Sequence, residues 1–153
     1  MCAMKGHLET VSWQEIHLDI RLLVELIPPD IDWKGMVAVS RGGLVPAALL
    51  AREIDLRLVD TLCIQSYEGR DQTSMEILKQ PSEAVVDAGQ GWLLIDDIAD
   101  TGDTLKAARK ILPRAHFATV YAKPAGEGLV DSVLHVVSQD TWVEFPWEKS
   151  PIL

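Results

Sequence analysis

Short apolar runs alternate with helix-patterned segments along this chain, and this alternation limits the possible folds more than any other feature. Strands that alternate with helices assemble into a mostly parallel sheet that is covered by helices. We therefore predict an α/β fold with a mostly parallel central sheet flanked by helices. The predicted strands cover residues 36–39, 58–64, 92–95, 117–122 and 133–137, and the predicted helices cover about 13–27, 46–53 and 104–112.

Local signals set the ends of two of these helices. Ser12 and Glu15 have the spacing of a capping box, in which each side chain accepts a hydrogen bond from the other residue's backbone amide. Pro28 and Pro29 end the first helix, because proline has no amide hydrogen to donate. Pro46 suits the first turn of the second helix, where that hydrogen is not needed.

Residues 66–90 are polar and weakly patterned, and we expect a long loop with at most a short strand or turn at 75–78. A loop of this length in a compact domain is usually a lid or a binding loop. We therefore predict that residues 66–80 act as a flexible lid over the functional site.

Composition narrows the class of protein. The chain has 153 residues, 48% of them apolar, and a net charge of −9, so we expect one globular domain over residues 1–153. The negative charge argues against a nucleic-acid partner, since duplex binding depends on clustered Lys and Arg. The sequence shows no apolar stretch long enough to cross a membrane and no signal peptide. Cys2 and Cys63 are the only cysteines, too few for a disulfide framework, and we therefore expect a cytoplasmic protein.

The first chemical motif is the turn Ser40-Arg41-Gly42-Gly43, directly after a predicted strand. Glycines allow the backbone to approach a ligand closely, and the arginine fork suits phosphate. A tight strand-to-helix turn with an exposed arginine explains the same residues, and the motif alone does not decide between the two interpretations.

The second motif is more specific. A hydrophobic strand ends in Asp96 and Asp97, and Asp100-Thr101-Gly102-Asp103-Thr104 then opens a helix. Amides at a helix N-terminus can hold a phosphate, and paired acids at a strand end suit Mg²⁺. Helix capping explains one of these acids but not all of Asp96, Asp97 and Asp100. The sequence therefore favours a phosphate and magnesium site.

The motif from Leu94 to Thr104 resembles the ribose-phosphate signature of the type I phosphoribosyltransferases, in which two acids after a strand precede Asp-Thr-Gly-x-Thr. The resemblance is greatest to the purine-specific bacterial members, and it includes Trp33-Lys34-Gly35, Lys123-Pro124-Ala125-Gly126 and Gln139-Asp140-Thr141-Trp142. It implies the fold of that family, with a lid loop and a small purine-binding hood.

The resemblance also implies a reaction. The family transfers phosphoribose from 5-phosphoribosyl-1-pyrophosphate to N9 of a 6-oxopurine and releases pyrophosphate, with Mg²⁺ as cofactor. It implies guanine and xanthine as substrates, with hypoxanthine as a third candidate, in purine salvage. The residues implied for binding the phosphoribosyl substrate are Arg41, Gly42, Asp96, Asp97, Asp100, Thr101, Gly102, Asp103 and Thr104.

Individual roles follow from the same resemblance. Asp97 is implied as the Mg²⁺ ligand, and Asp100 as the general base that accepts the proton from purine N7. Lys123 is implied as the donor to the 6-oxo group, Trp142 as the residue that stacks on the purine, and the Val143 backbone as the reader of its 2-substituent. The family resemblance also implies a homo-oligomer, typically a tetramer, and in some relatives peripheral association with the inner membrane.

The sequence departs from its relatives at three places. Asp103 stands where they have a second glycine, and its charge would repel a phosphate if it turned inward. Thr73 stands where they have a lid arginine, with Arg70 three residues earlier, and Glu148 replaces an aspartate.

Two other functions share features with this sequence. A non-catalytic regulator on the same fold would bind nucleic acid through a basic face, which the negative charge disfavours. A phospho-receiver module also pairs two acids with a Lys-Pro, but here too few residues separate Asp97 from Lys123 for the intervening strands and helices. Turnover of a labelled purine distinguishes an enzyme from a regulator.

Overall fold

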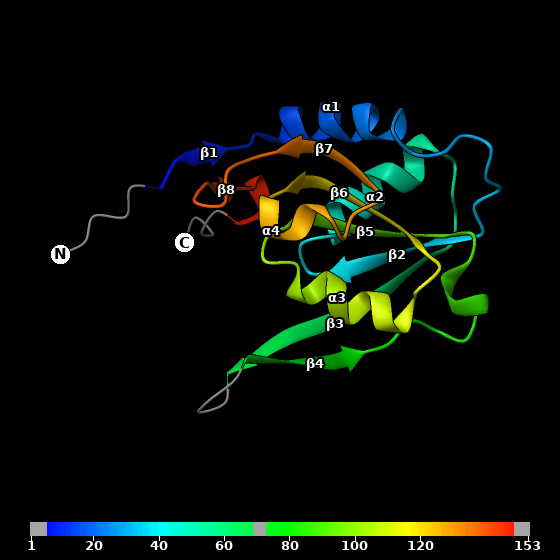
Figure 1. Cartoon of the computed structure of the whole chain (residues 1–153). Helices are drawn as coiled ribbons and strands as arrows, with labels where there is room; N and C mark the ends of the chain where they lie inside the picture. Colours follow the sequence, from blue (N-terminus) through cyan, green and yellow to red (C-terminus); the bar gives the residue numbers. More distant parts are fainter. Residues whose placement is uncertain (1–5, 69–72, 149–153) are drawn as a thin grey trace, which may run out of the picture.

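A computed structural model describes residues 6–68 and 73–148 of the chain, and its centre is a six-stranded sheet (Figure 1). The strand order is β4-β3-β2-β5-β6-β7, and β4 is antiparallel to β3 whereas the other neighbours are parallel. The predicted α/β fold with a mostly parallel sheet is confirmed. The strands are β2 (Gly35–Ser40), β3 (Val59–Glu68), β4 (Thr73–Lys79), β5 (Trp92–Ala99), β6 (His116–Ala122) and β7 (Ser132–Val136).

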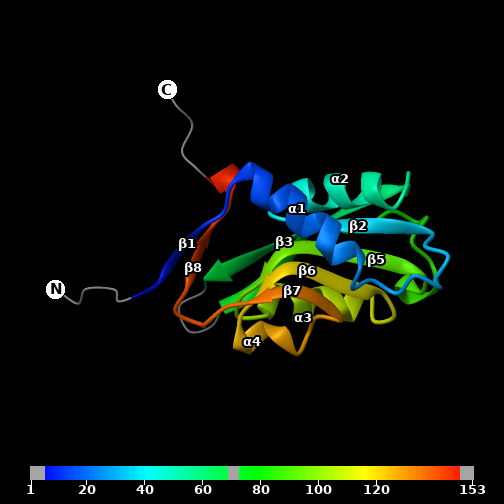
Figure 2. The ribbon, with the colours of Figure 1, turned by 90° about the horizontal axis from the view of Figure 1, so that it is seen from above.

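Helices cover both faces of the sheet (Figure 2). The helix α1 (Trp13–Val24) and the helix α2 (Leu44–Glu53) lie on one face, and α3 (Asp103–Ile111) and the short α4 (Pro124–Glu127) lie on the other. The described residues also form two 3₁₀ turns, η1 (Asp87–Gly89) and η2 (Pro146–Glu148). Within the described residues, no helix is long and apolar enough to span a bilayer.

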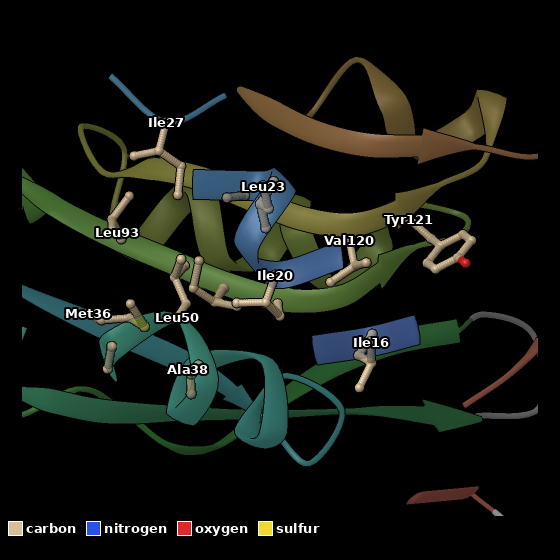
Figure 3. Close-up of a cluster of buried hydrophobic side chains, with 14 of the residues drawn as sticks. Ile16, Ile20, Leu23, Ile27, Met36, Ala38, Leu50, Leu93, Val120 and Tyr121 are labelled. Carbon is tan, nitrogen blue, oxygen red and sulfur yellow. The ribbon is translucent and has the colours of Figure 1, made fainter. Parts of the chain in front are cut away.

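Side chains of each strand point alternately to the two faces of the sheet, and this divides the core into two layers. Met36 and Ala38 of β2 pack under α1 and α2, whereas Val37 and Val39 belong to the layer under α3. Successive side chains of a strand point to opposite faces, so a strand buried on both faces is apolar throughout. Figure 3 shows the first layer, in which side chains of α1 and α2 meet those of β2, β5 and β6: Ile16, Ile20, Leu23, Leu50, Met36, Ala38, Leu93 and Val120.

The predicted start of α1 is confirmed. The Ser12 hydroxyl accepts from the Glu15 amide at 3.1 Å, and the Glu15 carboxylate accepts from the Ser12 amide at 2.7 Å. α1 ends at Val24, shortly before the proline pair.

The prediction of a long loop over residues 66–90 is wrong for much of the segment. β3 continues to Glu68 and pairs antiparallel with β4, with Ser66 opposite Met75, so residues 66–68 and 73–79 belong to a hairpin arm. The strand β4 lies at the edge of the sheet, where backbone hydrogen bonds hold it and its side chains are mostly exposed. The alternation of Met75 and Ile77 with polar residues is therefore too short a signal to predict the hairpin. The proposed role as a lid stays a prediction, and Arg70 lies outside the described residues.

A second sheet was not predicted. β1 (Leu8–Thr10) pairs in parallel with β8 (Trp142–Glu144), and Trp142 donates its backbone N–H to the His7 carbonyl at 2.8 Å. Both ribbon views show this pair beyond the end of the main sheet toward which the parallel strands point (Figures 1 and 2). We call this two-stranded sheet the hood.

Candidate functional site

The predicted site residues converge on one edge of the main sheet. Arg41 and Gly42 follow β2, residues 100–102 follow β5, and Lys123 follows β6, and these three strands are neighbours in the order β2-β5-β6. In parallel sheets, ligands bind beyond the carboxyl ends of the strands. The hood, which carries Trp142 and Val143, lies beyond the same edge (Figure 1).

The turn after β2 is packed against the acids at the end of β5. The Ser40–Arg41 peptide is cis, and the Gly43 amide donates to the Val39 carbonyl at 2.8 Å. A Cβ on Gly42 would lie between 2.5 and 2.7 Å from the carboxylate atoms of Asp97. Gly42 is therefore required because its missing side chain makes room for the Asp97 carboxylate, which links the two sequence motifs in space.

Asp96 and Asp97 are buried carboxylates, each 7% exposed. The backbone amide of Asp97 donates to the Asp96 carboxylate at 2.9 Å, and the amide of Ile98 donates to that of Asp97 at 2.7 Å. Burial, followed by the charge of Asp97, raises the pKa of Asp96 well above its usual value. Burial also raises the pKa of Asp97, with a further contribution from the charge of Glu148.

Among the described residues, no cation neutralises Asp96 and Asp97. In the part of the chain that the structure describes, no lysine, arginine or histidine forms an ion pair with Asp96 or Asp97. Buried carboxylates without a cationic partner are costly, and a divalent cation would offset that cost. The described residues contain no cluster of three or more potential metal ligands, so any Mg²⁺ here would take most of its ligands from water or substrate.

The loop from Asp100 to Thr104 starts α3. Gly102 has a φ of +87°, a left-handed conformation that favours glycine, and a Cβ there would also lie 2.5 Å from the Leu129 side chain. Thr101 donates its hydroxyl to the Asp103 carboxylate at 3.2 Å. Asp103 is exposed in the first turn of α3, where its charge complements the helix N-terminus, and Thr104 is half-buried in the same turn.

Asp100 and Lys123 form an ion pair. The Lys123 ammonium donates to the Asp100 carboxylate at 3.1 Å, and the lysine side chain is 7% exposed whereas that of Asp100 is 51% exposed. The Lys123 backbone amide donates to the Ala99 carbonyl at 2.8 Å, which holds the end of β6 beside the end of β5. Lys123 is therefore a buried, paired residue and not a solvated loop lysine.

The two hood residues differ in exposure. Trp142 is 63% exposed, so its ring is available to a ligand and is not a core residue. Val143 is 6% exposed and packs in the layer of core that contains α1 and α2, so its backbone is fixed.

Sequence reasoning missed Gln139 as a site residue. Its side-chain amide donates to the Asp100 carboxylate at 3.0 Å, although the two residues come from different loops. The only signal was its position directly before Asp140-Thr141-Trp142 in a matched motif.

Relatives of this sequence carry one enzyme name. Residues 7–150 match the phosphoribosyl transferase domain family. The xanthine-guanine phosphoribosyltransferase of Chromohalobacter salexigens is 52% identical over 139 residues, which cover 91% of this chain and 83% of that protein. The xanthine-guanine phosphoribosyltransferase of Nitratidesulfovibrio vulgaris is also 52% identical over 139 residues, which cover 90% of this chain and 83% of that protein.

Solved structures agree in fold. A purine phosphoribosyltransferase from Pyrococcus horikoshii superposes with a TM-score of 0.78 at 23% identity, over 95% of this chain and 97% of that chain. A xanthine-guanine-hypoxanthine phosphoribosyltransferase from Helicobacter pylori superposes with a TM-score of 0.77 at 26% identity, over 93% of this chain and 94% of that chain.

Proposed function

This chain belongs to the phosphoribosyltransferase family, and from that premise we propose that it is a purine-salvage enzyme that acts on guanine and xanthine. It transfers phosphoribose from 5-phosphoribosyl-1-pyrophosphate to purine N9 and releases pyrophosphate, with hypoxanthine as a third candidate substrate. The family predicted from the sequence motifs is confirmed by the matching relatives.

The phosphate groups bind at the turns after β5 and β2. The 5′-phosphate binds at residues 100–104, where Thr101 and Thr104 supply hydroxyls and the start of α3 supplies partial positive charge. Gly102 and Asp103 contribute backbone to this cradle. The pyrophosphate binds at Arg41 and Gly42, because an exposed guanidinium fork suits a doubly charged leaving group.

The buried acids suit a magnesium ion. Asp97 would hold it, next to the pyrophosphate turn, and Asp96 would face the ribose hydroxyls. When bound, Mg²⁺ neutralises charge that develops on the pyrophosphate leaving group. The support for this proposal is the pair of buried carboxylates, which form no ion pair with the described residues, and the packing of Gly42 against Asp97.

The purine binds between the ends of β5 and β6 and the hood. Lys123 donates to the 6-oxo group, and its ammonium carries three hydrogens, so it can keep Asp100 as a second acceptor. The Asp100 carboxylate accepts the proton of purine N7 as N9 attacks the ribose carbon. Trp142 stacks on the purine face, and the Val143 backbone contacts the 2-substituent.

The Asp100–Lys123 pair at 3.1 Å is the observation that carries this proposal, because it puts a base and an oxo-group donor in one site. The test is the initial rate with guanine, xanthine, hypoxanthine and adenine, each with 5-phosphoribosyl-1-pyrophosphate and Mg²⁺. We expect formation of the 6-oxopurine nucleotides, with loss of activity in EDTA and recovery with Mg²⁺. Nucleotide binding without any turnover would instead support a regulator.

Three further expectations come from the composition of the sequence and from its family. We propose a cytoplasmic homo-oligomer, typically a tetramer, with no nucleic-acid partner. Peripheral association with the inner membrane, seen in some relatives, is not needed for this function. Size-exclusion chromatography with light scattering tests the oligomeric state.

A further inference from the structure

Gln139 bridges two parts of the site that are far apart in the sequence. Its side-chain amide N–H donates to one oxygen of the Asp100 carboxylate at 3.0 Å, while Lys123 donates to the other oxygen at 3.1 Å. Its side-chain carbonyl accepts from the backbone amide of Ala125, near the start of α4, at 2.9 Å. Both polar ends of Gln139 are therefore used, and one of them is fixed to the backbone.

The turn that carries Gln139 is itself held by local hydrogen bonds. The hydroxyls of Ser138 and Thr141 are 2.7 Å apart, and the Thr141 amide donates to the Ser138 carbonyl at 3.0 Å. This turn leads directly into β8 and Trp142. Gln139 thus joins the Asp100 carboxylate to the strand that carries the purine-stacking ring.

Asp100 needs such a support because its side chain is half-exposed. With 51% of the side chain exposed, packing alone does not fix its rotamer. Lys123 is a shared partner, since in the proposed function it also donates to the purine 6-oxo group. Gln139 has no second role in the proposed reaction. Its hydrogen bond leaves other lone pairs of the Asp100 carboxylate free to accept the N7 proton.

We propose that Gln139 is a positioning residue that orients the Asp100 carboxylate toward the purine, an inference that rests on the proposed function. The hydrogen bond from Gln139 to Asp100 is charge-assisted. Its loss removes an interaction with the catalytic carboxylate and not with either substrate. We therefore expect replacement of Gln139 to change kcat and the KM for purine, and to leave the KM for 5-phosphoribosyl-1-pyrophosphate unchanged.

The experiment compares Gln139→Leu, Gln139→Glu, Asp100→Asn and the double variant Gln139→Leu/Asp100→Asn. Gln139→Leu removes every hydrogen bond of the Gln139 side chain at similar volume, including a long one of 3.5 Å to the backbone carbonyl of Asp100. Gln139→Glu keeps an acceptor for the Ala125 amide but puts a second carboxylate beside Asp100. The matched control is Gln14→Leu, at an exposed glutamine on α1.

We expect Gln139→Leu to lower kcat with guanine roughly tenfold to a hundredfold, the usual effect of one hydrogen bond to a charged group. Gln139→Glu should lower it at least as much. In the Asp100→Asn background, Gln139→Leu should change kcat by less than about twofold, because no carboxylate remains to be held. Gln14→Leu should match the wild type.

Three results would overturn the inference. One is a wild-type kcat in Gln139→Leu. Another is a loss of kcat on Gln139→Leu that is the same in the Asp100→Asn background as in the wild type. The third is near-normal activity of Gln139→Glu, which would show that Gln139 acts only through α4. If Gln139→Leu does not fold, as judged by thermal melting, Gln139→Glu decides. Failure of the proposed function is distinct, because the wild type itself would then form no nucleotide.

Discussion

The ammonium of Lys123 lies 3.1 Å from the carboxylate of Asp100, so the proposed oxo-group donor and the proposed base are in direct contact. Lys123 follows β6 and Asp100 follows β5, and the parallel pairing of these strands brings the two residues together. The lysine side chain is buried, and a buried ammonium requires a partner. In the absence of purine, Asp100 is that partner.

Replacing Lys123 tests its role in purine choice. We expect Lys123→Met to reduce the preference for guanine over adenine, because the ammonium can donate to a 6-oxo group but meets hydrogens on a 6-amino group. A site built around a required hydrogen bond can reject the mismatched base by roughly 10⁴-fold. The measurement is the ratio of kcat/KM for guanine and adenine.

The control for this substitution is Lys34→Met, at a lysine that precedes β2 at the opposite end of the sheet. It should leave the ratio unchanged. An unchanged ratio in Lys123→Met itself would show that the 6-oxo group is recognised by another residue.

Trp142 should affect all purines alike. Its ring is 63% exposed, and stacking depends on the face of the purine and not on the 6-substituent. We expect Trp142→Ala to raise the KM of guanine and xanthine by a similar factor, on the order of fivefold for a loss of about 1 kcal/mol. Trp142→Phe keeps a stacking surface and should retain most of the affinity. A change confined to one purine would contradict stacking.

The sequence predicted the site best where its residues are contiguous. Asp96, Asp97 and the residues up to Thr104 follow one strand and open one helix, so their spacing alone puts them at the ligand-binding edge. The sheet was predictable for the same reason, because its buried parallel strands read as apolar runs.

Contacts between distant loops were not predictable in this way. The bond from Gln139 to Asp100 joins residues that no periodic pattern relates. The pairing of β1 with β8 joins three-residue strands from opposite ends of the described chain, and such short segments carry no measurable alternation. The strand at residues 58–64 was predicted, but residues 66–68 of β3 and the strand β4 were misread as a loop, because the described side chains of this part of the hairpin are mostly exposed.

Asp103 tests the phosphate site. Its carboxylate accepts from the Thr101 hydroxyl at 3.2 Å, so it occupies a donor that we propose for the 5′-phosphate and adds a negative charge near the proposed site. We expect Asp103→Gly to lower the KM for 5-phosphoribosyl-1-pyrophosphate roughly twofold to fivefold, from a charge effect of about 0.5–1 kcal/mol at a helix N-terminus. Asp103→Asn keeps the acceptor without the charge and separates the two contributions. A higher KM in both variants would show that Asp103 assists binding.

The last prediction concerns stability at the base of the β3–β4 arm, where Asp60 is a hydrogen-bond acceptor for three groups. The amides of Ser82 and Thr61 donate to its carboxylate at 2.6 and 2.7 Å, and the Lys79 ammonium donates at 3.2 Å. Burial alone would raise the pKa of Asp60, but these donors outweigh it and lower the pKa from 3.8 to about 2.

A carboxyl group whose pKa is lower in the folded state stabilises that state above its unfolded pKa. The contribution of Asp60 is therefore complete above about pH 5 and is lost as the pH falls from about 4 toward 2. At neutral pH it amounts to about 2 kcal/mol, so Asp60→Asn should lower the free energy of unfolding by up to that amount. Urea titrations at pH 7 and pH 3 measure it, with Asp30→Asn, at an exposed aspartate, as control. The difference between the wild type and Asp60→Asn should shrink to roughly half between pH 7 and pH 3, because pH 3 lies between the folded and the unfolded pKa of Asp60. A difference that stays constant with pH would show that the side-chain charge of Asp60 contributes nothing.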